Sequence, residues 1–192
     1  MKSPSRIVIA EDEAIIRLDL REMLEEEGYE VVGEASDGET AISLTRELKP
    51  DLVILDIVMP GVDGLEAAAR ISDEDLAAVL ILTAFSQRDY VDRATRAGAM
   101  AYLVKPFDKH DLMPAVELAM ARWAEVRTLA DESKDLASRL EARKIVEKAK
   151  GVLMVKHGLS EQDSFRFIQR MAMQQRNTMA HVAEELLSKS ET

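Results

Sequence analysis

Six residues that are far apart in the sequence share one local setting, at the end of a short apolar run. Such runs are typical of buried strands in a parallel sheet, and helical patterns separate them. The six residues are Glu11, Asp12, Asp56, Thr83, Lys105 and Pro106. Ligands bind beyond the carboxyl ends of parallel strands, so we expect the carboxylates, the hydroxyl and the ammonium group to meet at one edge of the sheet.

The expected cluster has the chemistry of a site for a divalent cation and a phosphoryl group. Crowded carboxylates repel one another unless a cation neutralises them, and Mg²⁺ prefers oxygen ligands. The predicted ligands are Glu11, Asp12 and Asp56. Asp56 is also a candidate nucleophile, since aspartate forms acyl phosphates. Lys105 would pair with a phosphoryl oxygen, Thr83 would donate to it, and a cis bond to Pro106 would aim the lysine into the site.

The elements that must position these residues alternate along roughly the first 120 residues. Apolar runs predict strands near 6–10, 30–34, 51–56, 78–83 and 101–104. Helical periodicity predicts helices near 13–27, 38–48, 64–71, 87–97 and from 109 onward. This alternation predicts an α/β fold, a doubly wound five-stranded parallel sheet of the flavodoxin-like order 2-1-3-4-5.

The last of these helices has no clear stop before about residue 155. Apolar or small residues recur in it with the alternating spacing of a heptad pattern. They are Leu112, Val116, Ala119, Trp123, Val126, Ala130, Ser133, Ala137 and Leu140. The pattern favours a long helical stalk, with a linker over 123–140 that forms a coiled coil with a second copy. A helix that folds back on its own domain would show the same pattern.

The C-terminal part, 141–192, has patterns for a small domain of three amphipathic helices. Gly158 is a stop signal, Ser160 is an N-cap, and the last helix is expected to start near residues 177–178. Phe165 and Phe167 are expected to serve the shared core rather than to stack on bases.

Charge is distributed unevenly along this acidic chain, whose net charge is −11. Residues 1–138 hold 15 Lys and Arg against 29 Asp and Glu, whereas residues 139–192 hold 10 against 7. Such an asymmetry indicates a part that faces nucleic acid, although a solvated basic helix surface would give the same balance.

The sequence excludes several other kinds of site. It contains no cysteine, so disulfides and thiolate metal sites are ruled out. The three histidines, interpreted as surface or packing residues, are His110, His157 and His181. No apolar run of about 18 residues is present and no signal peptide precedes the first strand, so we expect a cytoplasmic protein with no membrane partner.

Over residues 6 to about 122 the sequence resembles the receiver domain of two-component response regulators. The matching stretches are VIAEDE at 8–13, DLVILDIVMPGVDG at 51–64, LTA at 82–84 and the residues from 98 to 107. The resemblance implies a receiver domain over 1–122, with Asp56 as the phosphoacceptor for a cognate sensor histidine kinase. It also implies that Asp12 and the backbone carbonyl of Val58 join Asp56 around Mg²⁺, and that Thr83 and Tyr102 form a switch pair.

Over about 139–188 the sequence resembles the ANTAR domain, an RNA-binding module of transcription antiterminators. The matching stretches are ARKIVEKAKGVLM at 142–154, LSEQDSFRFIQRMA at 159–172 and the pair VA at 182–183. Ser164 stands where alanine is usual in the family. The resemblance implies an ANTAR-type domain over 141–192, with RNA contacts by Arg143, Lys144, Lys148, Lys150, Arg166 and Arg170.

Together these resemblances imply a response regulator that binds hairpin RNA in transcript leaders and forms a homodimer on phosphorylation. The alternatives are an output domain that binds DNA or another protein. An aspartate-nucleophile phosphatase is disfavoured, because such enzymes need a second aspartate two residues after the nucleophile, where this chain has Val58. We therefore expect a regulator and not an enzyme.

Overall fold

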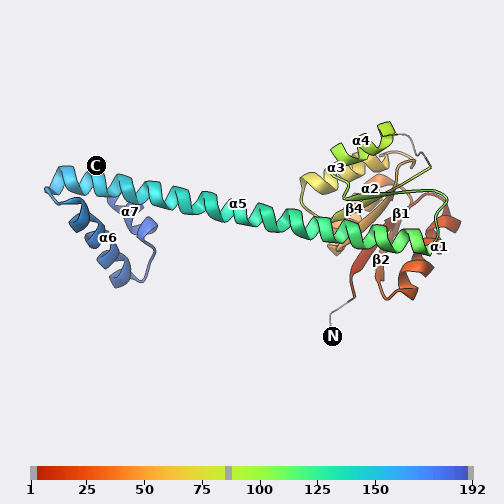
Figure 1. The fold of residues 1–192 in the computed structure, drawn as a ribbon, viewed down its shortest axis with the longest axis horizontal. Coiled ribbons are helices and arrows are strands. Elements are labelled where there is room, and N and C mark those ends of the chain that lie inside the picture. Colours follow the sequence, from red (N-terminus) through yellow and green to blue (C-terminus); the bar gives the residue numbers. More distant parts are fainter. Residues whose placement is uncertain (1–3, 85–87, 190–192) are drawn as a thin grey trace. The chain divides into compact units, whose positions relative to one another are not determined.

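The computed structural model describes residues 4–84 and 88–189, and the chain divides into two compact units. The first unit is Met1–Arg127 and the second is Thr128–Thr192. Figure 1 draws the elements of both units and labels many of them. The first unit contains β1 (Arg6–Ala10), α1 (Ala14–Glu26), β2 (Glu30–Ala35), α2 (Gly38–Leu48), β3 (Leu52–Asp56), α3 (Gly64–Asp73), β4 (Ala78–Thr83), α4 (Arg88–Arg96), β5 (Ala101–Val104) and the start of α5 (Lys109–His157).

The strands form one parallel sheet in the order β2-β1-β3-β4-β5. This confirms the predicted doubly wound fold, and each predicted strand lies within about one residue of its observed bounds. The predicted start of the fourth helix at residue 87 lies outside the described residues. In the register of the sheet, Asp56 on β3 is opposite Leu82 on β4, and Thr83 is opposite Val104 on β5.

Helices cover both faces of the sheet, because alternate strand residues point to opposite faces. On one face, Val8, Val53 and Ile81 pack against α2, α3 and α4. On the other face, strand residues such as Ile9 and Ile54 pack against α1 and α5. The central strands β3 and β4 are buried along their whole length, so their ends are held rigidly where the polar residues follow.

The first turns of α5 belong to the core of the N-terminal unit. Leu112, Val116 and Ala119 are fully buried there, and Trp123 is almost so. For this part of the heptad pattern the alternative left open by the sequence holds, because the helix folds back on its own sheet; of the predicted linker over 123–140, this burial involves Trp123. A heptad stripe and the apolar face of a packed helix have nearly the same period, so the sequence alone did not separate them.

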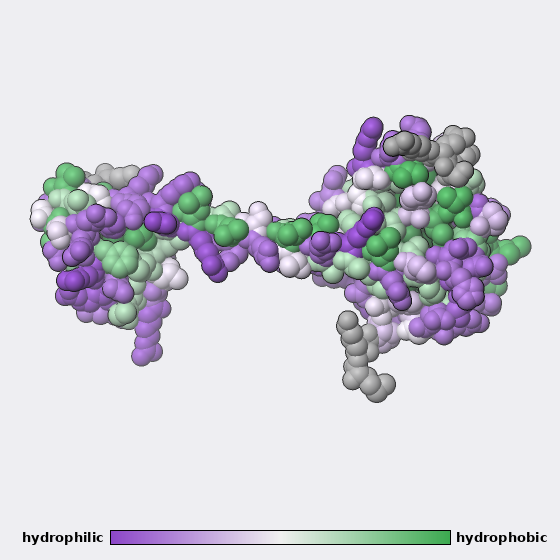
Figure 2. All heavy atoms as spheres, viewed as in Figure 1, coloured by the Kyte–Doolittle hydropathy of each residue, from purple (hydrophilic) through white to green (hydrophobic). Residues whose placement is uncertain are grey.

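The middle of α5 keeps several large apolar side chains in solvent. Val126, Leu129, Leu136 and Leu140 are all exposed. Figure 2 shows hydrophobic residues at the surface of this part of the helix. These four residues lie three, seven and four positions apart, which places them on one side of a helix.

The C-terminal unit consists of the end of α5, α6 (Glu161–Gln175) and α7 (Met179–Ser188). The predicted cap Ser160 accepts a hydrogen bond from the Asp163 amide, and Thr178 caps α7 in the same way through the His181 amide. The small core contains Ala149, Leu153, Ile168, Ala172, Val182 and Ala183. Among the described helices, none has an apolar stretch long enough to cross a membrane.

The two phenylalanines of α6 were expected in this core, and that expectation was wrong. Phe165 is 42% exposed and Phe167 is 37% exposed. The buried face of α6 is centred on Ser164, Ile168 and Ala172, which leaves the two rings on its flanks.

Candidate functional site

Three carboxylates meet where β1 and β3 end side by side. Ligand atoms of Glu11, Asp12 and Asp56 lie within 4.8 Å of one another. Glu11 is fully buried and Asp56 is nearly so, whereas Asp12 is exposed. The adjacency of β1 and β3 in the sheet brings the carboxylates together. The sequence predicted this cluster because both strands end at the same edge.

Lys105 reaches the same cluster from the loop that follows β5. Its Nζ atom lies 2.6 Å from Oε2 of Glu11 and 3.0 Å from Oδ2 of Asp56. Its backbone N–H donates to the Thr83 carbonyl at 2.7 Å, which ties the loop to the end of β4. The peptide bond between Lys105 and Pro106 is cis.

The electrostatics of this cluster leave negative charge uncompensated. Burial raises the pKa of the Glu11 carboxyl above its usual value, against the hydrogen bond from Lys105, and the charge of Asp56 adds to the rise. Burial also opposes the charge of Lys105, but its hydrogen bonds to Glu11 and Asp56 outweigh that cost and raise its pKa. One ammonium group faces three carboxylates. The cluster therefore has the oxygen ligands and the charge deficit that suit Mg²⁺.

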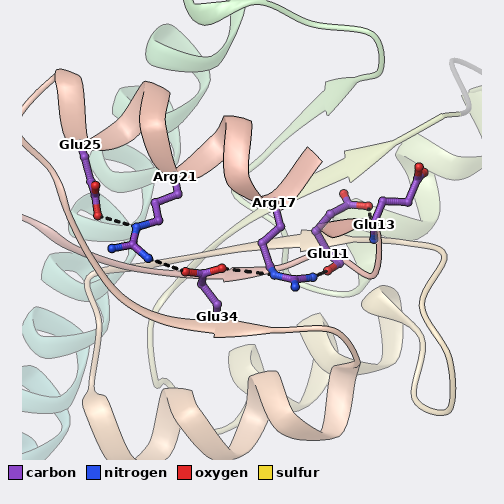
Figure 3. Close-up of polar contacts among 6 residues, drawn as sticks. All are labelled: Glu11, Glu13, Arg17, Arg21, Glu25 and Glu34. Carbon is purple, nitrogen blue, oxygen red and sulfur yellow. Dashed lines mark hydrogen bonds and ion pairs between the residues drawn. The ribbon is translucent and has the colours of Figure 1, made fainter. Parts of the chain in front are cut away.

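An arginine that sequence reasoning missed supports the loop that carries Glu11 (Figure 3). Arg17 donates from Nη1 to the Glu11 carbonyl oxygen at 2.6 Å and from Nε to Glu34 at 3.2 Å. Glu34 also accepts from Arg21, which pairs with Glu25 one helical turn further along α1. Arg17 and Arg21 are four residues apart on one helix face, but nothing in the sequence indicated that β2 would place Glu34 beside them.

Gly64 is a second residue whose role sequence reasoning missed. It begins α3, and a Cβ atom at this position would collide with the backbone carbonyl of Asp56. Its amide donates to the Ile57 carbonyl at 3.0 Å, and Asp63 caps the helix through the Glu66 amide. The loop after β3 therefore folds tightly against the candidate nucleophile, and only glycine permits that approach.

The remaining predicted residues of the receiver site differ in how far their side chains are buried. Thr83 is buried at the end of β4. Tyr102 on β5 pairs with Ile81, so it lies on the same sheet face as Thr83, but its side chain is 44% exposed. The side chain of Val58 is also exposed, in the loop after β3.

The predicted RNA-contacting residues of the C-terminal unit have two kinds of surroundings. Those that are exposed and have no ion-pair partner among the described residues are Arg143, Lys148, Arg166 and Arg170. Lys144 is exposed too, but it pairs with Glu141 at 2.7 Å.

Lys150 differs from the others because it is buried. Its Nζ lies 2.9 Å from Glu147 and 2.8 Å from Glu161. The hydrogen bonds to Glu161 and Glu147 raise the pKa of Lys150, and the same bond lowers the pKa of Glu161. The structure therefore gives Lys150 a bridging position between α5 and α6 and not a free cationic surface.

Two family models match the chain. The response regulator receiver domain matches residues 7–117, and the ANTAR domain matches residues 134–187. The transcriptional regulatory protein PdtaR of Mycobacterium tuberculosis is 58% identical over 184 residues, which cover 96% of this chain and 90% of that protein. The chemotaxis protein CheY of Halobacterium salinarum is 40% identical over 112 residues, 58% of this chain and 92% of that protein.

Solved structures resemble the N-terminal unit. A two-component response regulator of the LuxR family from Aurantimonas has a TM-score of 0.59 and 37% identity, and the match covers 62% of this chain and 86% of that one. The response regulator domain of CheB from Thermotoga maritima has a TM-score of 0.57 and 27% identity, covering 62% of this chain and 97% of that one.

The site geometry and these matches agree on one architecture. The acidic cluster lies at the end of the parallel sheet in the part that matches the receiver model, and the basic three-helix unit lies in the part that matches the ANTAR model. The chain therefore belongs to the response regulators, as a receiver domain followed by an ANTAR domain, and it is similar to the transcriptional regulator PdtaR.

Proposed function

We propose that this protein is a phosphorylation-controlled, RNA-binding regulator that acts in transcription antitermination. A sensor histidine kinase phosphorylates Asp56, and the ANTAR domain then binds hairpin RNA in transcript leaders. The observation that carries the proposal is the cluster of Glu11, Asp12 and Asp56 with Lys105 inside a receiver fold that is joined to an ANTAR domain.

The receiver residues have distinct roles in phosphoryl transfer. A carboxylate oxygen of Asp56 attacks the phosphorus of a phosphohistidine, the P–N bond breaks, and the imidazole nitrogen leaves with the bonding electrons. Asp12, Asp56 and the Val58 carbonyl would hold Mg²⁺, with Glu11 beside them. A Mg²⁺ ion bound by these residues would neutralise negative charge on the incoming phosphoryl group.

The same residues convert the modification into a change of shape. Lys105 pairs with Asp56 in the unphosphorylated chain. Once Asp56 is phosphorylated, Lys105 pairs with a phosphoryl oxygen. The hydroxyl of Thr83 donates to the phosphoryl group, and the exposed ring of Tyr102 turns inward on the same face of the sheet. The movement of β5 and the following loop biases α5, whose first turns pack on that sheet.

The exposed apolar side of α5 supports a homodimer in the phosphorylated state. Val126, Leu129, Leu136 and Leu140 provide a stripe that a second copy of the helix can cover in a coiled coil. Leu129 and Leu136 replace Ala130 and Ala137 of the seam expected from the sequence. The larger side chains would bury more apolar surface per residue, which favours this register.

RNA contact is assigned to the exposed cations that lack an ion-pair partner in the described part of the chain. Arg143, Lys148, Arg166 and Arg170 are free to neutralise phosphates, whereas Lys150 holds α5 to α6. Lys144 gains less from RNA, because it must first give up its contact with Glu141.

The test is the affinity of the phosphorylated chain for a hairpin RNA and for a duplex DNA at several salt concentrations. The proposal predicts tighter binding to the hairpin RNA at every salt concentration. Tighter binding to duplex DNA would assign a DNA-binding output, and no binding to either would indicate a protein-interaction output.

A further inference from the structure

The α6 helix carries an aromatic residue, Phe165, that lies outside the buried core of the ANTAR domain. The buried core of the ANTAR domain is made of aliphatic side chains and lacks an aromatic residue among the described positions. Phe165 nevertheless remains 42% exposed beside that core. A single exposed apolar residue needs no explanation, so the surroundings of the ring decide whether it has a role.

The ring of Phe165 lines two hollows in the surface of this domain. The first has a volume of about 500 Å³ and lies between α5, α6 and the start of α7, with Val146 and Met179 in its lining. The second has a volume of about 390 Å³ and includes Gln162 and Arg166. Phe165 and Lys150 line both hollows, so the ring lies at the boundary between them.

The charges around these hollows favour an anionic ligand. Arg143 lines the first hollow and Arg166 the second, and neither has an ion-pair partner among the described residues. The two glutamates that line the hollows, Glu147 and Glu161, both pair with Lys150. An apolar floor with an aromatic ring is thus flanked by two free guanidinium groups.

We propose that Phe165 stacks on an unpaired nucleobase of the bound RNA, with Arg143 and Arg166 at the phosphates on either side. Every nucleobase has a π-face, and stacking on an aromatic side chain is how proteins hold bases of single-stranded loops. Lys150 is a positioning residue here, because its bridge between α5 and α6 holds the ring at the boundary of the hollows. The inference rests on the proposed RNA-binding function. It adds that this surface binds an unpaired nucleobase of the RNA.

An unpaired base fits this surface better than a paired one. Bases within a duplex are covered by their neighbours, so a ring on a protein helix reaches them only after unstacking. A loop of a hairpin offers bases that are already free, together with flanking phosphates that match the two arginines by charge. Binding of an uncharged peptide would leave those arginines without partners.

The experiment compares Phe165→Ala and Phe165→Leu with the matched control Phe167→Ala in the full-length chain, treated with acetyl phosphate and Mg²⁺. Phe167 lies on the same helix and is similarly exposed, but it does not line either hollow. The probe is a pool of RNA hairpins with one fixed stem and a randomised loop. The same stem without a loop, as an RNA duplex, is the second probe. Circular dichroism melting of each variant reports whether the domain is folded.

We expect Phe165→Ala and Phe165→Leu to weaken the binding of hairpins that were selected from the pool for their loop sequences. The expected loss of affinity is about tenfold to a hundredfold. The duplex probe should bind all variants within about twofold, because its phosphate contacts are retained. Phe167→Ala should match the wild type on both probes. The salt dependence of hairpin binding should stay the same for Phe165→Leu, because no charge is lost.

Fluorescence of the RNA gives a second readout, which does not rely on affinity. 2-Aminopurine placed at one loop position at a time should be quenched on binding at the position that stacks, and Phe165→Leu should remove that quenching. Equal hairpin affinity for Phe165→Leu and the wild type, with no quenched position, would overturn the stacking site alone. Absence of hairpin binding by the wild type would overturn both this inference and the proposed function.

Discussion

Asp56 shows how a single side chain is prepared by its surroundings. It is nearly buried, it lies 3.0 Å from the Lys105 ammonium group, and the close approach of Gly64 fixes its backbone. A carboxylate held in this way would be positioned for the proposed attack on phosphorus, which would lower the entropic cost of that reaction.

Replacement of Asp56 by Asn should abolish phosphorylation while leaving the fold intact, because the side chains are nearly isosteric. Intact-mass measurement after treatment with acetyl phosphate and Mg²⁺ should show one added phosphoryl group on the wild type and none on the variant. Thr83→Ala is the control, since it alters the switch and retains the nucleophile. A phosphoryl group retained on Asp56→Asn would assign the acceptor to another residue.

Ser164 carries the one buried side-chain polar atom in the described residues that has no hydrogen-bond partner. Its side chain is fully buried in the α6 face of the ANTAR core. Such a hydroxyl costs free energy because it loses its bond with water and gains none in the protein.

Ser164→Ala should therefore stabilise the ANTAR domain by roughly 1 kcal/mol, measured as a shift of its urea unfolding midpoint. Ser160→Ala, a serine replacement four residues earlier, should have the opposite effect and destabilise by roughly 1 kcal/mol through loss of the α6 cap. A lower midpoint for Ser164→Ala would mean that its hydroxyl has a partner in solution.

At the scale of elements, α5 has different surroundings along its length. Its first turns are buried on the receiver sheet, its middle exposes a stripe of apolar residues, and its last turns belong to the ANTAR core. Burial removes Leu112 to Trp123 from any intermolecular seam, whereas the middle of the helix remains available for pairing.

The double variant Leu129→Lys with Leu136→Lys should weaken self-association of the phosphorylated chain by at least about tenfold. Two ammonium groups in an apolar seam lose burial and repel their counterparts. Sedimentation equilibrium measures the effect, and Ser138→Lys is the control, because it adds a lysine on the opposite side of the helix. Unchanged self-association of the double variant would place the dimer interface elsewhere.

The strands, the cap at Ser160 and the carboxylate cluster were predictable from the sequence because each depends on local pattern and on topology. Apolar runs identified β1 and β3, and the rule for parallel sheets then placed Glu11 beside Asp56. The surroundings of Lys150 and Phe165 were not predictable. Glu161 comes from another helix, and the exposure of Phe165 depends on which residues of α6 face the small core.

At the scale of the whole molecule, an acidic receiver and a basic output domain share one chain. Residues 1–138 hold 15 basic against 29 acidic side chains, and residues 139–192 hold 10 against 7. An acidic surface repels RNA at long range, so we expect the proposed RNA contact to be confined to the part of the chain that carries the free cations.

The cations without ion-pair partners should contribute to the salt dependence of RNA binding. Arg143→Ala with Lys148→Ala should reduce the slope of log affinity against log salt by about 1 to 2, because two phosphate contacts are lost. Lys144→Ala, whose ammonium group already pairs with Glu141, should change the slope less. Equal slopes for the wild type and the double variant would place the RNA surface on other residues.

Control of the ANTAR domain by Asp56 is tested most directly by the affinity of the full chain for a hairpin RNA with and without phosphorylation, in the wild type and in Asp56→Asn. Acetyl phosphate with Mg²⁺ should tighten hairpin binding by the wild type and leave the affinity of Asp56→Asn unchanged. The same affinity for the wild type in both states would contradict the claim that Asp56 controls the ANTAR domain.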